Sequence, residues 1–147
     1  MSDRRPPRYL KPMNRIVKAI QMLGIPAGPS QILTVRGRKS GKLRSTPMTP
    51  FEHDGGLYTV AGYPGADWAA NARAAGAGTL SRGRKSRPIK IIELSPEDAG
   101  PVLRSFALEV PVGVGFAKRS GLVREGTLDE FEALAGMLAV FRFDPQR

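Results

Sequence analysis

The stretch QILTVRGRKSGKLRSTPMTPFEHDGGLYTV, residues 31–60, decides the fold. Three apolar or β-branched runs in and around it predict strands, at 30–36, from Leu43 onward, and at 57–61. Two turns separate these runs, the basic segment 37–42 and Asp54-Gly55-Gly56. Consecutive strands joined by such short turns pair antiparallel, so a parallel βαβ architecture is excluded for this part of the chain.

The second strand carries two prolines, Pro47 and Pro50. Proline has no backbone N–H to donate to a neighbouring strand, so it is confined to sheet edges and bulges. We therefore expect this strand to lie at an edge of the sheet or to be broken by a bulge around Pro47.

Helix signals follow the first three strands. Asp67 is the expected N-cap of a helix that runs to Ala75 and ends at Gly76. Ser95 is the expected cap of a second helix, which Pro101 is expected to bend. A capping box at 127–130 starts a third helix, expected to reach about Leu138.

Strands are also predicted at 77–81, 88–94 and 139–143. The order of elements favours an α+β protein, a small and mostly antiparallel barrel of six or seven strands with helices packed outside. The length indicates a single domain over 1–147. Its first part, 1–29, reads as a basic amphipathic helix at 10–23 followed by a linker.

Composition narrows the chemistry. Because cysteine is absent, thiolate chemistry is excluded. His53 is the single histidine, so a multi-histidine metal site is excluded too, and we expect no metal site. A hydrolytic triad would have to be built on His53, without a nucleophile elbow anywhere in the sequence. The formal net charge of +10 instead indicates an anionic partner: nucleic acid, phospholipid, or a ligand with phosphate and carboxylates.

The segment Arg36–Arg44 is the best candidate for binding such an anion. It offers turn backbone N–H groups, a serine hydroxyl and five cationic side chains. It matches neither a P-loop nor a dinucleotide-binding fingerprint. The tetrapeptide Gly-Arg-Lys-Ser recurs at 83–86, where we interpret it as an exposed basic turn.

The basic segment is part of a longer sequence motif. Gly37-Arg38-Lys39-Ser40-Gly41-x-x-Arg44-x-x-Pro47, then a Gly-Gly hairpin, then Trp68-x-x-Asn71, resembles the deazaflavin-dependent nitroreductase and quinone reductase family of actinobacteria. The resemblance covers roughly 31–94 and implies a split β-barrel of the FMN-binding type. It also implies an oxidoreductase that transfers a hydride from reduced coenzyme F420 to an acceptor, with FMN as the second choice of cofactor.

The resemblance assigns roles position by position. Arg38, Lys39 and Ser40 match the turn that holds the phosphate and oligoglutamate tail of the coenzyme, and Arg44 matches a further tail contact. Thr46 and Pro47 match strand positions against the deazaflavin ring, and Ala61 and Gly62 match the start of the loop around it. Trp68 and Asn71 match residues of the short helix beside the coenzyme. Trp68 can also be read as a core anchor. No side chain is assigned as a nucleophile, because the coenzyme supplies the hydride and the catalytic residues remain unknown.

The acceptor is inferred from side chains that differ from the family pattern. Family members that reduce nitroimidazoles place tyrosines near the acceptor in the C-terminal part, whereas this sequence has tyrosine only at positions 9, 58 and 63. Apolar residues stand there instead: Phe106, Val112, Val114 and Phe116. We therefore expect an apolar acceptor such as a quinone or enone in preference to a nitro compound.

Several alternatives remain open at this point. The basic N-terminal helix could rest on anionic lipid, which would make a cytoplasmic protein membrane-associated, or it could pack on the barrel. The chain could also be a basic barrel that binds nucleic acid, although aromatic residues do not alternate with its cations as in single-strand binders. An FMN-binding protein or a carrier of a cofactor or lipid would use the same fold. A monomer and a homodimer are both compatible with the sequence.

Overall fold

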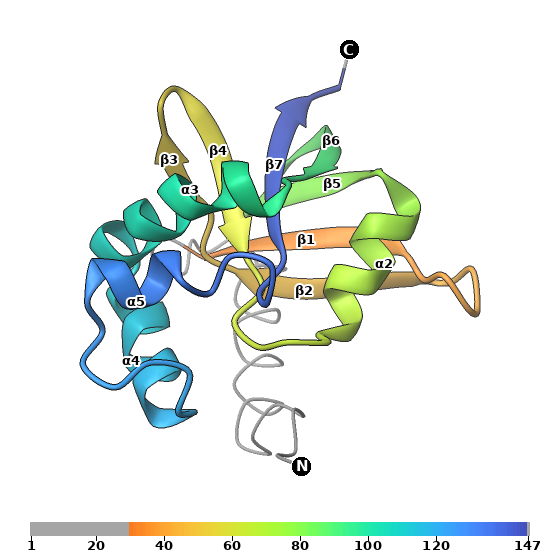
Figure 1. The fold of residues 1–147 in the computed structure, drawn as a ribbon. Coiled ribbons are helices and arrows are strands. Elements are labelled where there is room, and N and C mark those ends of the chain that lie inside the picture. The colour runs from red at the N-terminus through yellow and green to blue at the C-terminus, as the bar shows by residue number, and fades with distance from the viewer. Residues whose placement is uncertain (1–29, 147) are drawn as a thin grey trace.

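A computed structural model describes residues 30–146 (Figure 1). Seven strands form one antiparallel sheet in the order β2-β1-β5-β6-β7-β4-β3. The strands are β1 (Gln31–Arg36), β2 (Leu43–Met48), β3 (Phe51–His53), β4 (Gly56–Val60), β5 (Ala77–Arg82), β6 (Lys85–Glu93) and β7 (Val140–Pro145). This is the antiparallel split β-barrel that the sequence predicts.

The connection between β2 and β3 forces the sheet to curl. These strands are the two edges of the sheet, yet only Thr49 and Pro50 separate them in sequence. The three Cα–Cα steps from Met48 to Phe51 span at most about 11 Å, so both edges must come close at this point. No hydrogen-bonded ladder joins β2 to β3 within residues 30–146, and the barrel is therefore not closed.

Of the two alternatives for the proline-bearing strand, the edge position is confirmed, and the ladder has no bulge at Pro47. Pro47 lies in the ladder opposite Ile32, and the interruption comes at Thr49 and Pro50. An edge strand tolerates Pro47 because the missing N–H can face away from the neighbouring strand. The predicted single strand is thus two strands on opposite edges.

Four helices lie outside the sheet in the described part of the chain: α2 (Asp67–Ala75), α3 (Pro96–Glu109), α4 (Pro111–Arg119) and α5 (Leu128–Glu132). In Figure 1, α3, α4 and α5 gather on one side, whereas α2 lies apart from them near β1, β2 and β5. No helix within residues 30–146 combines the length and apolar character needed to span a membrane.

Each helical region has its own buried cluster. The barrel interior contains Leu33, Val35 and Leu80 together with the small residues of α2. A second cluster lies under α3, α4 and α5, around Phe106 and Phe131. Strand β7 connects the two clusters, since Val140 belongs to the helical one and Phe141 to the barrel, as the alternation of side chains along a strand dictates.

Helix boundaries correct several expectations. Ala66, not Asp67, is the N-cap of α2, and it makes no side-chain cap hydrogen bond. The Ser95 cap of α3 is confirmed, and the helix continues through Pro101. The capping box of Thr127 and Glu130 is also confirmed, but α5 ends at Glu132, well before Leu138.

Two further elements differ from the sequence pattern. Helix α4 was not expected, because its residues PVGVGFAKR combine β-branched side chains with glycines that lower helix propensity. Strand β6 begins at Lys85 rather than near Pro88, so the connection to β5 is a tight turn and not a six-residue loop. Residues 85–87 are polar and were expected to form a loop, but their backbone pairs with β5 and they form a strand.

The helix predicted at 10–23 and the linker that follows it lie outside the described residues.

Candidate functional site

The β1–β2 turn is closed by its own backbone. The Gly37 N–H donates to the Lys42 carbonyl at 2.7 Å, and the Gly41 N–H donates to the Gly37 carbonyl at 3.0 Å. Gly41 has a φ of 73°, a conformation that glycine adopts without strain. A Cβ at Gly37 would lie 3.1 Å from the Lys42 carbonyl oxygen, so a side chain here would crowd the turn.

Helix α2 fixes this turn through Asn71. The Asn71 Oδ1 accepts from the Arg38 backbone N–H at 3.1 Å and from Arg38 Nη1 at 2.7 Å. Asn71 is buried and 33 positions away in sequence, so these bonds are a tertiary contact. One amide oxygen thereby holds both the backbone and the guanidinium of Arg38 in place.

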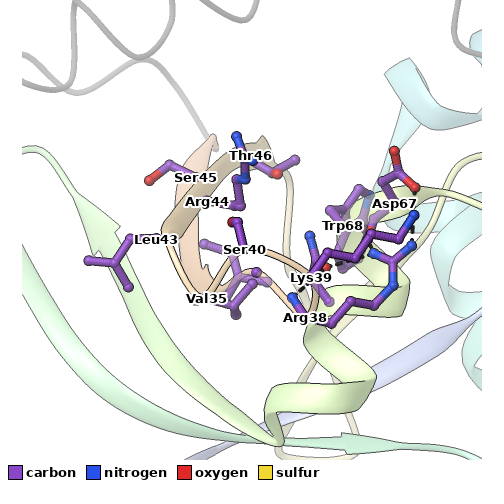
Figure 2. Close-up of a pocket in the computed structure, with 13 residues that line it drawn as sticks. Val35, Arg38, Lys39, Ser40, Leu43, Arg44, Ser45, Thr46, Asp67 and Trp68 are labelled. Atoms are coloured by element: carbon purple, nitrogen blue, oxygen red, sulfur yellow. Dashed lines mark hydrogen bonds and ion pairs between the residues drawn. The ribbon is translucent and has the colours of Figure 1, made fainter.

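A pocket of about 560 Å³ lies between the turn, strand β2 and helix α2. Figure 2 shows the turn facing the start of α2, where Asp67 and Trp68 project beside Arg38. Its lining residues are Leu33, Val35, Gly37, Arg38, Lys39, Ser40, Leu43, Arg44, Ser45, Thr46, Asp67, Trp68 and Asn71. The pocket therefore combines cations from the turn and from β2 with apolar side chains of the barrel.

The pocket contains most of the residues singled out from the sequence. Arg38, Lys39, Ser40, Arg44, Thr46, Trp68 and Asn71 all line it. Trp68 serves two purposes, because its ring lies 5.7 Å from that of Phe141, centroid to centroid, and packs against the barrel core. Trp68 is thus both a core residue and a pocket-lining residue.

Three singled-out residues lie elsewhere. Pro47, which pairs with Ile32 in the β1–β2 ladder, does not line this pocket. Ala61 lines a neighbouring pocket of about 350 Å³. Gly62 faces the Phe116 ring, since a Cβ added there would lie 3.7 Å from it.

Sequence reasoning missed several lining residues. Asp67 was interpreted only as a helix cap, yet it lines the pocket and pairs with Arg38. Its spacing to Asn71 was the available signal, because residues four apart share one face of a helix. Leu33 and Val35 could have been found similarly, as alternate residues on one face of β1.

The electrostatics of the pocket favour an anion. The Asp67 carboxylate lies 3.5 Å from Arg38 Nη2, but its side chain is 92% exposed, so water weakens this pair. The side chains of Lys39 and Arg44 have no hydrogen-bond or ion-pair partner within residues 30–146. Three cations thus converge on the pocket against one carboxylate.

The neighbouring pocket shares Arg38 and Asp67 with the first. Tyr63 lines it, and burial, aided by the negative charge of Asp67, raises the pKa of the Tyr63 hydroxyl. Hydrogen bonds from Arg73, at 2.7 and 2.6 Å, lower the pKa of the Glu93 carboxyl in the same wall. Because its pKa is raised, the Tyr63 hydroxyl stays protonated at neutral pH and can donate a hydrogen bond.

Of the apolar residues expected near an acceptor, only Phe116 lies close to this region. Its ring centroid is 6.5 Å from that of Tyr63. Phe106 is instead buried in the helical core, Val114 packs against that core, and Val112 is exposed. Of the four residues, Phe116 is thus the one that borders the neighbouring pocket.

His53 makes a structural contact. Its Nδ1 and the Ser105 Oγ are 2.5 Å apart, while its Nε2 lies 3.5 Å from a carboxylate oxygen of the exposed Asp54. None of these residues lines the pocket at the β1–β2 turn. The contact ties β3 to α3.

Comparison with known proteins assigns the family. The model of a family described as F420H(2)-dependent quinone reductase matches residues 9–120, which is most of the chain. The chain belongs to the F420H(2)-dependent quinone reductase family. The resemblance deduced from the turn motif is thereby confirmed, and the protein is an F420-dependent oxidoreductase. A comparison with curated proteins finds no significant match.

Two of the solved structures that resemble this chain, those with TM-scores above 0.5, share its fold at low sequence identity. A protein of unknown function from Agrobacterium tumefaciens is 14% identical over 100% of this chain and 58% of its own, with a TM-score of 0.56. The haem storage protein HutZ from Vibrio cholerae is 9% identical over 90% of this chain and 89% of its own, with a TM-score of 0.51. An F420-H2 dependent reductase is 22% identical over 80% of this chain and 95% of its own, with a TM-score of 0.47.

Proposed function

We propose that this F420-dependent reductase holds the anionic tail of the coenzyme in the pocket at the β1–β2 turn and passes its hydride to an apolar acceptor, a quinone or an enone. The observation that carries the proposal is the convergence of Arg38, Lys39 and Arg44 on one pocket, with Arg38 fixed by Asn71. A phosphodiester with several carboxylates is the class of ligand that such a cluster binds.

The residues present fit this group. The pocket volume lies in the range of ligand sites, roughly 300–1,000 Å³. Lys39 and Arg44 are exposed and keep their charges available. Leu33 and Val35 give the pocket an apolar wall, and a planar ring that packs against it would remove apolar surface from water, which is favourable.

Each side chain has a defined task in this proposal. Arg38 offers a guanidinium fork whose position Asn71 sets in advance, which lowers the entropy lost on binding. Lys39 and Arg44 add charge-assisted hydrogen bonds to the tail, and the Ser40 hydroxyl is a further donor. Thr46 and Trp68 bound the pocket on the side of β2 and α2.

The ring contacts at Pro47, Ala61 and Gly62 rest on the family resemblance alone. Ala61 lines the neighbouring pocket and Gly62 faces the Phe116 ring, and we expect the acceptor to approach on this side. When bound and reduced, F420 supplies the hydride. The protein positions the reactants and excludes water, and no side chain needs to act as a nucleophile.

Fluorescence titration with oxidised F420, compared with FMN, tests the cofactor. F420 should bind at least tenfold more tightly, because FMN lacks the polyanionic tail that meets Lys39 and Arg44. Equal or tighter binding of FMN would favour an FMN protein of the same fold. Binding of random duplex DNA without binding of F420 would favour the nucleic-acid alternative.

Turnover tests the acceptor. With reduced F420 in excess, a menaquinone analogue should be consumed faster than a nitroimidazole under the same conditions. Preference for the nitro compound would overturn the proposed acceptor class and leave the F420 assignment intact.

A further inference from the structure

The neighbouring pocket has the size and lining of a site for a small apolar ligand. Its volume of about 350 Å³ lies within the roughly 300–1,000 Å³ of ligand sites. Most of its lining is alanine and other apolar residues, among them Leu94, Met137 and Leu138. It shares Arg38 and Asp67 with the pocket at the β1–β2 turn, so a molecule bound here would lie beside the coenzyme.

The charged side chains of this pocket are already engaged. Arg73 donates two hydrogen bonds, of 2.7 and 2.6 Å, to the Glu93 carboxylate. Arg38 donates to Asn71 and is paired with Asp67. A ligand carbonyl oxygen accepts hydrogen bonds, so the two carboxylates cannot serve it, and both guanidiniums already have partners.

Tyr63 differs from these charged residues. Its hydroxyl has no hydrogen-bond partner within residues 30–146, although the side chain is half-buried and lines the pocket. Taking a polar group out of water without giving it a hydrogen bond costs free energy, which a ligand that accepts the bond would recover. Because burial raises the pKa of this hydroxyl, it keeps its proton at neutral pH. Tyr63 therefore supplies the pocket with a neutral donor that is not yet used.

The surrounding structure holds this hydroxyl in place. The loop that carries it is tied at one end, where the Ala61 N–H donates to the Ala139 carbonyl at 2.9 Å, and it turns at Gly65, which has a φ of 73°. The Tyr63 ring packs against the barrel core and lies 6.5 Å from the Phe116 ring, centroid to centroid. A donor that is positioned before the ligand arrives loses little entropy on binding.

We propose that the acceptor binds in the neighbouring pocket through a conjugated carbonyl group, whose oxygen accepts a hydrogen bond from the Tyr63 hydroxyl. This inference rests on the proposed function and deepens it, because it assigns the acceptor a pocket and a recognition group. The apolar lining receives the hydrocarbon part of a quinone or enone, and Tyr63 distinguishes such a molecule from a hydrocarbon of the same shape.

The same hydroxyl takes part in the reaction. When a hydride is added to the carbon β to the carbonyl, the π electrons move to the oxygen, which becomes negative. The Tyr63 hydroxyl stabilises this charge and passes its proton to the oxygen, and water then reprotonates the tyrosinate. The acceptor thus gains two electrons and two protons and becomes an enol or, after tautomerisation, a hydroquinone.

Binding of two matched probes to the free protein tests the contact. Menadione carries two carbonyl groups, and 2-methylnaphthalene has the same carbon skeleton without them. Y63F keeps the ring and removes the hydroxyl, so in equilibrium dialysis it should bind menadione about three- to tenfold more weakly than the wild type. It should bind 2-methylnaphthalene within about twofold of the wild type. The control Y58F removes a hydroxyl from β4, outside this pocket, and should change neither affinity.

Turnover tests the proton transfer. With reduced F420 and menadione, Y63F should slow single-turnover oxidation of the coenzyme at least about tenfold, because a donor to the developing negative charge is lost. F420 affinity should be unchanged in Y63F, since Tyr63 does not line the pocket at the β1–β2 turn.

The opposite results would overturn the inference. Equal binding of menadione by Y63F and the wild type would show that the hydroxyl does not meet the carbonyl. Equal losses for both probes would mean that Y63F only disturbs the shape of the pocket, and an unchanged rate would remove Tyr63 from the reaction. A wild type that binds menadione through Tyr63 but does not bind F420 would instead refute the proposed function and leave the contact standing.

Discussion

The tetrapeptide Gly-Arg-Lys-Ser occurs twice between antiparallel strands, and the two copies do different things. At 37–40 it forms a wide turn that is bonded to α2 and lines a pocket. At 83–86 it forms a tight hairpin whose side chains are exposed. Identical residues therefore become a ligand pocket or a bare cationic tip according to what the fold places beside them.

The glycines show how the two conformations arise. Gly83 takes a φ of 61° inside a two-residue turn, which brings Arg82 and Lys85 into direct opposition. Gly37 does not adopt a positive φ, and the reversal falls later, at Gly41, so the first turn is wide enough for Arg38 to reach Asn71. The residue after the tetrapeptide differs accordingly: glycine in the first copy and arginine in the second.

The largest expected effect separates the two copies by function. R38A/K39A should weaken F420 binding by on the order of 100-fold or more, since each lost charged hydrogen bond is worth about 1.5–3 kcal/mol. R84A/K85A removes the same residues from the second copy and should bind F420 within about twofold of the wild type. Fluorescence titration measures both, and similar losses in the two variants would show that only net charge matters.

The next effect tests whether Asn71 makes the difference between the copies. N71A should lower the free energy of unfolding by about 1–2 kcal/mol, because the Arg38 N–H loses its acceptor, and should weaken F420 binding about tenfold. N71D keeps an acceptor oxygen but adds a negative charge to the pocket. It should therefore retain thermal stability yet bind F420 as weakly as N71A.

Denaturation and titration of the two variants separate these roles. If N71D restored both stability and affinity, Asn71 would act only on the turn and not through the charge balance of the pocket.

A smaller effect tests the repulsion in the second copy. R82E places a carboxylate opposite Lys85 and should raise the melting temperature by about 1–4 °C, from a gain of roughly 0.5–1 kcal/mol. R84E removes the same charge in the turn, where no cross-strand partner faces it, and should raise the melting temperature less. Calorimetry that found R82E no more stable than R84E would dismiss the charge pair as a source of strain.

The smallest effect concerns Asp67, for which the second copy has no counterpart. D67N removes the one carboxylate that competes for Arg38 and should tighten F420 binding by up to about fivefold at low salt, an effect that salt should reduce. D98N, an exposed aspartate in the first turn of α3, is the control and should change nothing. Weaker binding in D67N would mean that Asp67 positions Arg38 rather than competing for it.

Local sequence patterns predicted the parts of the fold that depend on neighbours along the chain. The capping box at Thr127 and the Ser95 cap are satisfied by residues three positions away, so their sequence signal is complete. The helix over 111–119 was missed because its stability comes from packing on α3 and not from propensity. Among the pocket residues, the turn could be recognised in the sequence as a dense cluster of cations. The role of Asp67 could not, because it depends on α2 lying against that turn.

By itself, the sequence determined an antiparallel α+β barrel, the edge position of the strand that carries Pro47, and a cationic turn with the motif of its family. These features rest on short-range chemistry: turn residues, missing donors and charge density. The motif around 37–47 also predicted which copy of Gly-Arg-Lys-Ser is the binding turn. Only the tertiary structure decided how that turn is held, because this depends on the Asn71 oxygen arriving from 33 residues away and on the antiparallel register that sends the other copy to the far end of the sheet. A hydrogen bond between distant segments leaves no local trace in the residues that it joins.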